Sequence, residues 1–312
     1  MKAVFFGSSE FSLYALQACL DFGVQVDWVV TTPDQKKGRG LRPAPTPVKV
    51  FAEKKLLNVL TPGTLKEDTC EKEIRRTAPD LFVVSSYGKM IPGAWLGIPS
   101  KIALNVHPSL LPKYRGASPI VRPILNGDRE TGVSVAEVTP KLDSGDILAQ
   151  ARVALEGEID AVELQEKLGE LSYQVLRDVF VSLKQNTLHR IPQDESAATY
   201  AAKVSKEEGK TCFAETAEAL SRKIRAFQPW PGVYFFLQKN PIHLLKAKAV
   251  NSGKSGKPGT LLEIGKDGGI DVATGNGVIR IFFVKPAGRN SMSAADFIRG
   301  QRIQPGVLIG DA

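Results

Sequence analysis

Cysteine is scarce in this sequence of 312 residues, which contains only Cys19, Cys70 and Cys212. An odd number of widely separated cysteines does not form a disulfide framework, so we expect a protein of a reducing, cytoplasmic compartment. No uninterrupted apolar run approaches the roughly 18 residues of a membrane span. The chain begins with a short apolar run that ends at Gly7, which leaves no room for the apolar segment of a signal peptide.

Histidine is equally scarce, with His107, His189 and His243 far apart in the sequence. No two histidines have the spacing of a metal site and no cysteine pair complements them, so we expect no metal. A G-x-G-x-x-G run is also missing after the first apolar run, which removes the usual support for a nicotinamide dinucleotide. The residues there, Gly7-Ser8-Ser9-Glu10, are interpreted as a strand end and a helix N-cap, with contact to a substrate as the alternative.

The net charge of +8 is concentrated in the last third of the chain. Residues 203–312 carry 17 Lys or Arg against 9 Asp or Glu, whereas residues 1–202 carry 24 of each. Such an excess attracts a polyanion and speeds its arrival. Composition alone leaves two interpretations open, a nucleic-acid partner or a surface kept soluble by lysine.

The first half of the chain alternates strand-like and helix-like segments, which predicts an α/β fold with a mainly parallel sheet. The expected strands are short, apolar and β-branched: Val4–Phe6, Val26–Thr31, Leu81–Ser86 and Ile102–Val106. The expected helices include two with apolar residues on one side: Phe11–Phe22 and Ala161–Leu183. Because ligands of such sheets bind at the carboxyl ends of the strands, residues that follow a strand are candidates for the site.

The second half is different in pattern. Residues 186–206 are polar and without periodicity and are interpreted as a linker between a domain of residues 1–185 and a domain of residues 207–312. A helix over Glu215–Phe227 is followed by short apolar runs separated by glycine and lysine: Val233–Leu237, Ile242–Val250, Gly259–Ile264, Gly269–Ala273 and Val278–Val284. Several short strands at this spacing predict a small β-barrel, and the basic charge favours the oligonucleotide-binding (OB) type.

Two polar side chains stand at the end of the fourth predicted strand. Alternation along a strand places Asn105 and His107 on the same face, where an amide and an imidazole can both donate to one developing oxyanion. Asp143 adds a carboxylate in a loop that enters a later strand. Taken alone, a histidine at a strand end is more often structural than catalytic.

The wider pattern resembles the folate-dependent formyltransferases. The resemblance rests on Asn105 and His107 together with Ser109-Leu110-Leu111-Pro112, Arg115-Gly116 and Leu142-Asp143-Ser144-Gly145-Asp146, in this order and spacing. It implies a Rossmann-like domain that takes a formyl group from 10-formyltetrahydrofolate. It also implies that Asn105, His107 and Asp143 are catalytic and that two segments line the folate site: Ser109, Leu110, Leu111 and Pro112, and Tyr87, Gly88, Lys89, Met90 and Ile91. Arg115 has two interpretations, a structural ion pair or a substrate contact.

Two further segments resemble the methionyl-tRNA formyltransferases in particular. They are Pro33–Lys49, with Gly38-Arg39-Gly40 at the tip of an expected hairpin, and Ile224-Arg225-Ala226-Phe227-Gln228-Pro229-Trp230-Pro231-Gly232. The resemblance implies that the first segment enters the acceptor end of a tRNA and that the second domain lies inside the tRNA bend. The expected tRNA contacts are basic: Lys36, Lys37, Arg39, Arg42 and Lys206. One departure from that family's pattern is Cys212-Phe213 where an acidic residue and tryptophan are usual.

The resemblance implies a specific reaction. A formyl group passes from 10-formyltetrahydrofolate to the α-amino group of methionine on initiator Met-tRNA, by direct attack through a tetrahedral intermediate that Asn105 and His107 stabilise and Asp143 assists. We expect a monomer. The alternatives are an RNA-binding module on an inactive scaffold, a glycinamide ribonucleotide formyltransferase, which leaves the second domain unexplained, and a sugar-amine formyltransferase, which leaves the basic hairpin unexplained.

Overall fold

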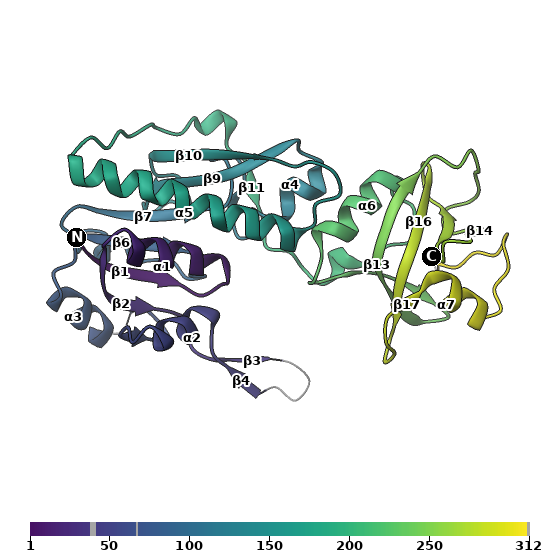
Figure 1. Ribbon diagram of the computed structural model, residues 1–312, viewed down its shortest axis with the longest axis horizontal. Helices are drawn as coiled ribbons and strands as arrows, with labels where there is room; N and C mark the ends of the chain where they lie inside the picture. The colour runs from purple at the N-terminus through teal and green to yellow at the C-terminus, as the bar shows by residue number, and fades with distance from the viewer. Residues whose placement is uncertain (38–41, 67, 311–312) are drawn as a thin grey trace. The chain divides into compact units, whose positions relative to one another are not determined.

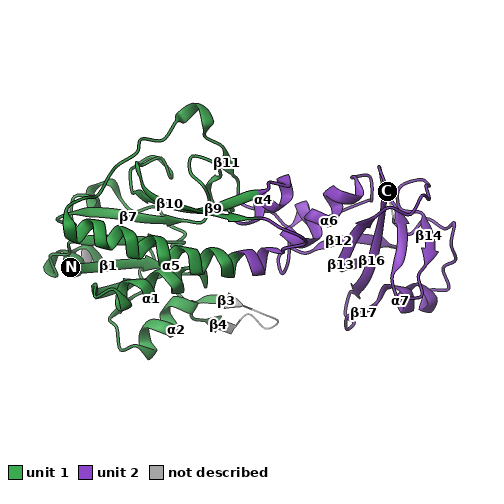
Figure 2. Cartoon of the chain, turned by 45° about the horizontal axis from the view of Figure 1, so that its top comes forward, with its two compact units in different colours: residues 1–119, 130–154, 165–202 green, residues 120–129, 155–164, 203–312 purple. Residues whose placement is uncertain are grey.

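The computed structural model describes residues 1–37, 42–66 and 68–310 (Figure 1). The chain forms two compact units, and it passes between them more than once (Figure 2). Unit 1 contains residues 1–119, 130–154 and 165–202, and unit 2 contains residues 120–129, 155–164 and 203–312. No helix of the described residues is both long enough and apolar enough to cross a membrane.

Unit 1 is built on a seven-stranded sheet with the order β10-β9-β7-β6-β1-β2-β5. Its strands are β1 (Lys2–Gly7), β2 (Gln25–Val30), β5 (Val59–Leu60), β6 (Leu81–Ser85), β7 (Ile102–His107), β9 (Glu130–Glu137) and β10 (Ile147–Ala154). The five strands from β7 to β5 pair in parallel, and β9 and β10 continue the sheet in antiparallel fashion. The predicted α/β fold with a mainly parallel sheet is confirmed.

Side-chain alternation in the central strands builds the core of unit 1. Val4 and Phe6 of β1 lie fully buried in a cluster with Ile74 and Trp95. Phe5 points to the opposite face and is equally buried, so both faces of the sheet are covered. The helices of this unit are α1 (Phe11–Asp21), α2 (Pro47–Lys54), α3 (Asp68–Arg76), the 3₁₀ turn η1 (Gly93–Trp95) and most of α5 (Ala161–Gln185).

The segment before α2 forms a hairpin. Strands β3 (Gln35–Lys37) and β4 (Arg42–Ala44) pair antiparallel, so the hairpin expected around Gly38-Arg39-Gly40 is present at its base. Arg39 itself lies outside the described residues. The following helix α2 begins at a true cap, because the Thr46 hydroxyl accepts a hydrogen bond from the Lys49 amide at 3.1 Å.

The predicted N-cap of α1 is wrong. No side chain caps this helix; the Ser12 hydroxyl, inside the first turn, accepts from the Ser9 amide at 3.3 Å. Ser8 is used elsewhere, since its hydroxyl donates to the Tyr87 carbonyl at 3.2 Å and accepts from the Thr32 amide at 3.2 Å. Ser8 therefore ties the ends of β1, β2 and β6 together.

Unit 2 contains an antiparallel sheet with the order β12-β13-β16-β15-β14, and β17 pairs with β16. Its elements are α4 (Val121–Asn126), η3 (Glu207–Gly209), α6 (Ala217–Ala226), β12 (Val233–Leu237), β13 (Asn240–Val250), β14 (Leu261–Ile264), β15 (Ile270–Ala273), β16 (Val278–Pro286), β17 (Met292–Ser293) and α7 (Ala294–Gly300). All five predicted strands are confirmed within a few residues. The closure of this sheet into an OB barrel stays a prediction.

The segment interpreted as a linker has structure of its own. It contains a 3₁₀ turn, η2 (Glu195–Ala197), and strand β11 (Tyr200–Ala201), which pairs in parallel with β8 (Arg115–Gly116). Residues 186–202 of this segment belong to unit 1 and residues 203–206 to unit 2. The domain boundaries at residues 185 and 206 stay a prediction.

Candidate active site

The candidate catalytic side chains meet where two parallel strands of unit 1 end. Strands β6 and β7 lie side by side with Val84 opposite Asn105, and His107 is the last residue of β7. The loop of residues 138–146, between β9 and β10, returns past this strand end and brings Asp143 to it. The structure therefore unites the three residues that the sequence singled out.

Asp143 lies at the centre of the polar contacts. Its Oδ1 accepts from the Asn105 side-chain amide at 2.9 Å, and its Oδ2 accepts from the backbone amide of Gly116 at 2.8 Å. Its backbone has a φ of 48°, in the left-handed region that side chains other than glycine adopt at a cost of about 1–2 kcal/mol. Both carboxylate oxygens therefore accept hydrogen bonds, and the bond to Oδ1 orients the side-chain amide of Asn105.

The imidazole of His107 is buried and held on one side by the backbone. Its Nε2 lies 2.9 Å from the Tyr114 carbonyl oxygen. Because a carbonyl only accepts, Nε2 carries a hydrogen, and Nδ1 is the nitrogen that remains for chemistry. Nδ1 lies 3.7 Å from Asp143 Oδ2, close enough for ion pairing when the ring is protonated.

These residues face a cavity of about 460 Å³ within unit 1. Its lining includes Asn105, His107 and Asp143 as well as the predicted folate segment, which is Tyr87, Gly88, Lys89, Met90 and Ile91. Within that segment the Lys89 ammonium donates to the carbonyls of Pro62 and Gly63, so it secures the loop. Burial raises the pKa of the Tyr87 hydroxyl, which keeps it neutral.

The second predicted folate segment lies elsewhere. Ser109, Leu110, Leu111 and Pro112 are absent from the lining of this cavity. They are held by the sheet instead: the Leu111 amide donates to the Ser134 hydroxyl at 3.0 Å, and that hydroxyl donates to the Ser109 carbonyl at 2.6 Å. A role of these four residues toward folate stays a prediction.

Arg115 has an internal role. Its side chain is fully buried, and its guanidinium donates to Gln193 Oε1 and to both carboxylate oxygens of Glu195. The hydrogen bonds to Glu195 are the main cause that raises the pKa of Arg115. Of the two interpretations left open by the sequence, the structure supports the structural ion pair.

Four of the five expected tRNA contacts lie within the described residues. Lys36 and Lys37 belong to β3 and Arg42 to β4, so they share the hairpin base. Lys206 is an exposed residue of unit 2. Burial, together with the charges of Lys285 and Lys206, lowers the pKa of His243.

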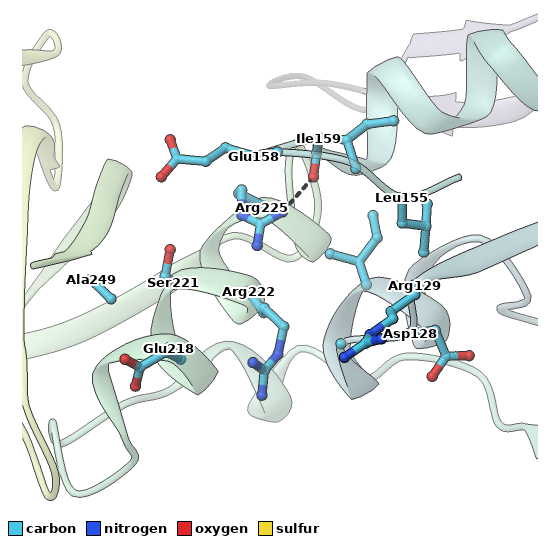
Figure 3. Close-up of a pocket in the computed structure, with 13 residues that line it drawn as sticks. Asp128, Arg129, Leu155, Glu158, Ile159, Glu218, Ser221, Arg222, Arg225 and Ala249 are labelled. Carbon is cyan, nitrogen blue, oxygen red and sulfur yellow. Dashed lines mark hydrogen bonds between the residues drawn. The ribbon is translucent and has the colours of Figure 1, made fainter. Parts of the chain in front are cut away.

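A second cavity of about 370 Å³ lies wholly in unit 2 (Figure 3). Two arginines that line it are anchored to backbone carbonyls: Arg225 donates to Ile159 at 2.8 Å and Arg222 to Leu125 at 3.2 Å. Its lining carries as many acidic as basic side chains, namely Asp128, Glu158, Glu218, Arg129, Arg222 and Arg225. The formal charges of this lining balance, so the lining shows no preference for an anionic or a cationic ligand.

Two family models match the chain. Residues 1–180 match the formyl transferase model, and residues 203–302 match the formyl transferase C-terminal domain model. The chain belongs to the formyl transferase family. The family prediction is thereby confirmed.

The curated relatives of this chain carry a more specific name than the family models do. The chain is 42% identical over 310 residues to a methionyl-tRNA formyltransferase of Thermus thermophilus, and the match covers 99% of both chains. It is 39% identical over 305 residues to that of Myxococcus xanthus, covering 98% of this chain and 96% of the relative.

Solved structures with a similar fold have much lower identity. A variant of HypX from Aquifex aeolicus matches with a TM-score of 0.66 at 16% identity, and the match covers 98% of this chain and 48% of that chain. The N-formyltransferase of Helicobacter canadensis, in complex with folinic acid and dTDP-3-aminofucose, matches with a TM-score of 0.66 at 18% identity over 90% of this chain and 98% of that chain. These likenesses establish the formyltransferase fold.

Sequence reasoning missed several groups of this site. The Tyr114 carbonyl and the Gly116 amide are backbone atoms, which no side-chain pattern identifies. Gln193 also escaped, although its side-chain amide donates to the carbonyls of Asp143 and Gly145. It lies 50 residues beyond Asp143 in a segment without periodicity, and only the fold brings the two together.

Proposed function

We propose that this protein transfers the formyl group of 10-formyltetrahydrofolate to the α-amino group of methionine on initiator Met-tRNA. The observation that carries the proposal is the contact of Asn105, His107 and Asp143 at the rim of one cavity at the carboxyl end of β7. Full-length relatives named methionyl-tRNA formyltransferase support the choice of reaction.

Asn105 is the proposed oxyanion donor. Its Nδ2 carries two hydrogens, and one of them is bonded to Asp143 Oδ1. That bond fixes the direction of the second hydrogen, which is then free to donate to the formyl oxygen as negative charge develops on it. A donor that is oriented before the reaction stabilises the transition state without reorganisation.

His107 is the proposed proton carrier. The neutral amine attacks the formyl carbon, a nitrogen–carbon bond forms, and the attacking nitrogen must lose a proton. Nδ1 of His107 accepts it because Nε2 is already bonded to the Tyr114 carbonyl. The imidazolium is stabilised by Asp143 Oδ2 and donates to the oxyanion. When the bond between the formyl carbon and N10 breaks, the same proton passes to N10.

The cavity suits the donor in size and lining. Its volume of about 460 Å³ falls within the range of roughly 300–1,000 Å³ that small-molecule sites occupy. Ile91, Val106, Val138 and Leu142 provide apolar walls. The backbone of Tyr87–Ile91 would supply donors and acceptors to a pterin ring, and the positive φ of Gly88 gives this loop a turn that other residues rarely adopt.

Unit 2 suits an RNA acceptor. Lysine ammonium groups lie over aromatic rings, with Lys210 5.8 Å from the centroid of Phe236 and Lys248 5.5 Å from that of Phe282. Trp230 is 56% exposed. Lysines beside accessible aromatic rings pair with phosphates and stacked bases. We infer that this unit, with the basic hairpin of Lys36, Lys37, Arg39 and Arg42, binds the tRNA.

The test is a comparison of acceptors. The protein is incubated with 10-formyltetrahydrofolate and either aminoacylated initiator tRNA or a nucleotide-linked amino sugar, and formylated products are measured. We expect N-formylmethionyl-tRNA and no formylated sugar. Formylation of the sugar without formylation of Met-tRNA would overturn the proposal, and tRNA binding without any transfer would indicate an inactive scaffold.

A further inference from the structure

Residues 191–201, here named the strap, run along two parts of the candidate active site. At one end, Ile191 and Ile147 exchange two backbone hydrogen bonds of 2.9 Å. At the other end, strand β11 pairs with β8, and the Thr199 hydroxyl accepts from the Tyr114 amide at 2.9 Å. The strap therefore connects the Asp143 loop with the segment whose carbonyl binds His107.

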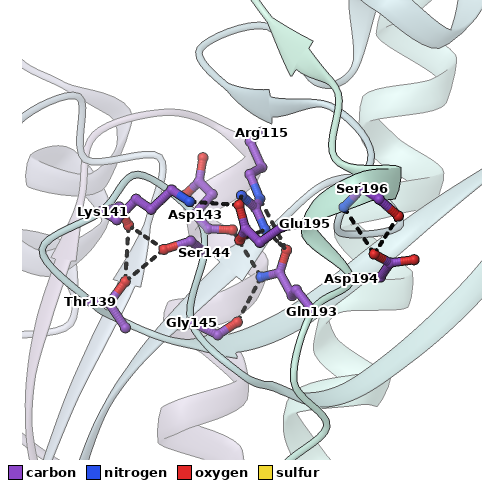
Figure 4. A network of polar contacts seen from close by, with 10 residues as sticks. All are labelled: Arg115, Thr139, Lys141, Asp143, Ser144, Gly145, Gln193, Asp194, Glu195 and Ser196. Atoms are coloured by element: carbon purple, nitrogen blue, oxygen red, sulfur yellow. Dashed lines mark hydrogen bonds and ion pairs between the residues drawn. The ribbon is translucent and has the colours of Figure 1, made fainter.

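Gln193 makes the closest contact of the strap with the catalytic loop. Its Nε2 donates to the Asp143 carbonyl at 2.9 Å and to the Gly145 carbonyl at 2.6 Å, which uses both amide hydrogens (Figure 4). Its Oε1 accepts from Nε and Nη2 of Arg115 at 3.1 and 2.8 Å. Every polar group of this side chain is bonded, so its orientation is fixed.

Arg115 is in turn held from the far side. Two further N–H groups donate to Glu195, and Glu195 also accepts from the Lys141 ammonium at 2.6 Å. Arg115 and Lys141 lower the pKa of Glu195 to about 2. The order Lys141, Glu195, Arg115, Gln193 forms a continuous chain of bonds that starts and ends on the loop of residues 138–146 (Figure 4).

The loop needs such support because its backbone is constrained. Asp143 has a positive φ, and Gly145 leaves no room for a side chain, since a Cβ there would lie 1.9 Å from the Glu137 carbonyl oxygen. A strained conformation persists only where surrounding contacts determine it. The two bonds from Gln193 fall on these two constrained residues.

We propose that Gln193 is a positioning residue that holds the Asp143 carboxylate against Asn105 and His107, and that Arg115 fixes Gln193 for this task. The inference rests on the proposed function for its kinetic consequence. Gln193 contacts only the backbone of the loop, so it acts through Asp143. A displacement of about 1 Å in a positioned group can cost on the order of 100-fold in turnover.

Two variants of the full chain separate positioning from folding. Gln193→Glu keeps the acceptor for Arg115 and loses both donors to the loop, whereas Gln193→Ala loses all four bonds. Gln185→Ala is the matched control, because Gln185 is exposed at the end of α5. The readouts are kcat and KM for donor and Met-tRNA, the melting temperature, and the side-chain amide resonances of Asn105, which report its bond to Asp143.

We expect both Gln193 variants to lower kcat about 10- to 100-fold while KM changes less than about twofold. Gln193→Glu should stay folded at the assay temperature, and the Asn105 resonances should shift. Wild-type kcat in Gln193→Glu would overturn the inference, as would a loss of kcat that merely follows the loss of folded protein. The Asn105 resonances do not depend on the acceptor, so they still test positioning if wild-type protein fails to formylate Met-tRNA, a failure that would refute only the proposed function.

Discussion

At the scale of single residues, the hydrogen bonds within the candidate site determine which polar atoms remain available to a substrate. The Tyr114 carbonyl occupies His107 Nε2, and Asp143 occupies one hydrogen of Asn105. What remains is one imidazole nitrogen and one amide hydrogen. This division of atoms is the basis on which we propose proton transfer for His107 and charge stabilisation for Asn105.

Replacing Asn105 tests its role as oxyanion donor. Asn105→Ala should lower kcat by about 10²–10³, with little change in KM for the folate donor, because the lost bond forms fully only in the transition state. Single-turnover formylation measures the effect. Asn58→Ala is the control, since its amide donates to the Asp27 carbonyl at an exposed position. A loss below about threefold in Asn105→Ala would contradict the oxyanion role.

Glu195 gives a prediction about pH. Its pKa in the folded protein is lowered from 4.5 to about 2, first by Arg115 and then by Lys141. A carboxyl whose pKa is lower in the folded state stabilises the fold above its unfolded pKa, and this contribution is lost as the pH falls from about 4.5 toward 2. Urea unfolding should therefore show wild type more stable than Glu195→Gln near neutral pH, with the difference closing across that window.

The control for this measurement is Glu156→Gln, because Glu156 is exposed and makes no ion pair with a described residue. Its stability difference from wild type should stay constant over the same pH range. An equal pH dependence of the two differences would contradict the pairing of Glu195 with Arg115 and Lys141.

At the scale of elements, the loop of residues 138–146 carries the candidate carboxylate, Asp143, and its backbone is constrained. The close approach of Gly145 to Glu137 and the bonds from Gln193 constrain its conformation, in addition to backbone bonds from Glu137 to Asp146 and from Val138 to Ala103. A loop held by distant segments presents Asp143 in one orientation, which a catalytic carboxylate requires.

Substitution of Gly145 tests this constraint. In Gly145→Ala the new Cβ would lie 1.9 Å from the Glu137 carbonyl oxygen, so the loop must move. We expect the free energy of unfolding to fall by about 1–3 kcal/mol, and kcat to fall with it as Asp143 is displaced. Gly97→Ala is the control, since no atom lies within 4 Å of the Cβ position at Gly97. Equal stability and activity of the two variants would show that the loop tolerates movement.

The elements that could be predicted from the sequence are those defined by a local pattern of neighbouring residues. Apolar runs such as Leu81–Ser85 and Val233–Leu237 were predicted because burial imposes a local pattern. Asn105 and His107 were found because strand alternation is also local. Strand β9 and helix α7 were not anticipated, although β9 flanks the site. Gln193 could not be found either, because contacts between residues 50 apart leave no periodic signal.

At the scale of the whole molecule, the basic excess and the candidate catalytic residues lie in different parts of the sequence. The basic excess lies in residues 203–312, whereas the candidate catalytic trio lies in residues 105–143. The family models divide the chain in the same way. The proposed function therefore places formyl chemistry and acceptor binding on separate physical bases, and the two should respond differently to salt.

The salt dependence of tRNA affinity tests whether the basic residues of 203–312 bind the acceptor. Neutralising even two phosphates should lower tRNA affinity about tenfold between roughly 50 and 200 mM salt, because bound counterions are released. KM for the folate donor should change far less. The double variant Lys206→Gln, Lys285→Gln should reduce the slope of log Kd against log salt, and Lys101→Gln, in the unit that carries the catalytic trio, should not. An unchanged slope in the double variant would place the RNA elsewhere.

The most direct measurement is single-turnover formylation of initiator Met-tRNA by wild type and His107→Ala, with tRNA affinity measured on the same samples. The proposed proton transfer uses His107 Nδ1, and the ring is buried within unit 1. We predict that transfer is abolished while tRNA affinity stays within about twofold of wild type. Transfer at the wild-type rate in His107→Ala would contradict the catalytic site described here.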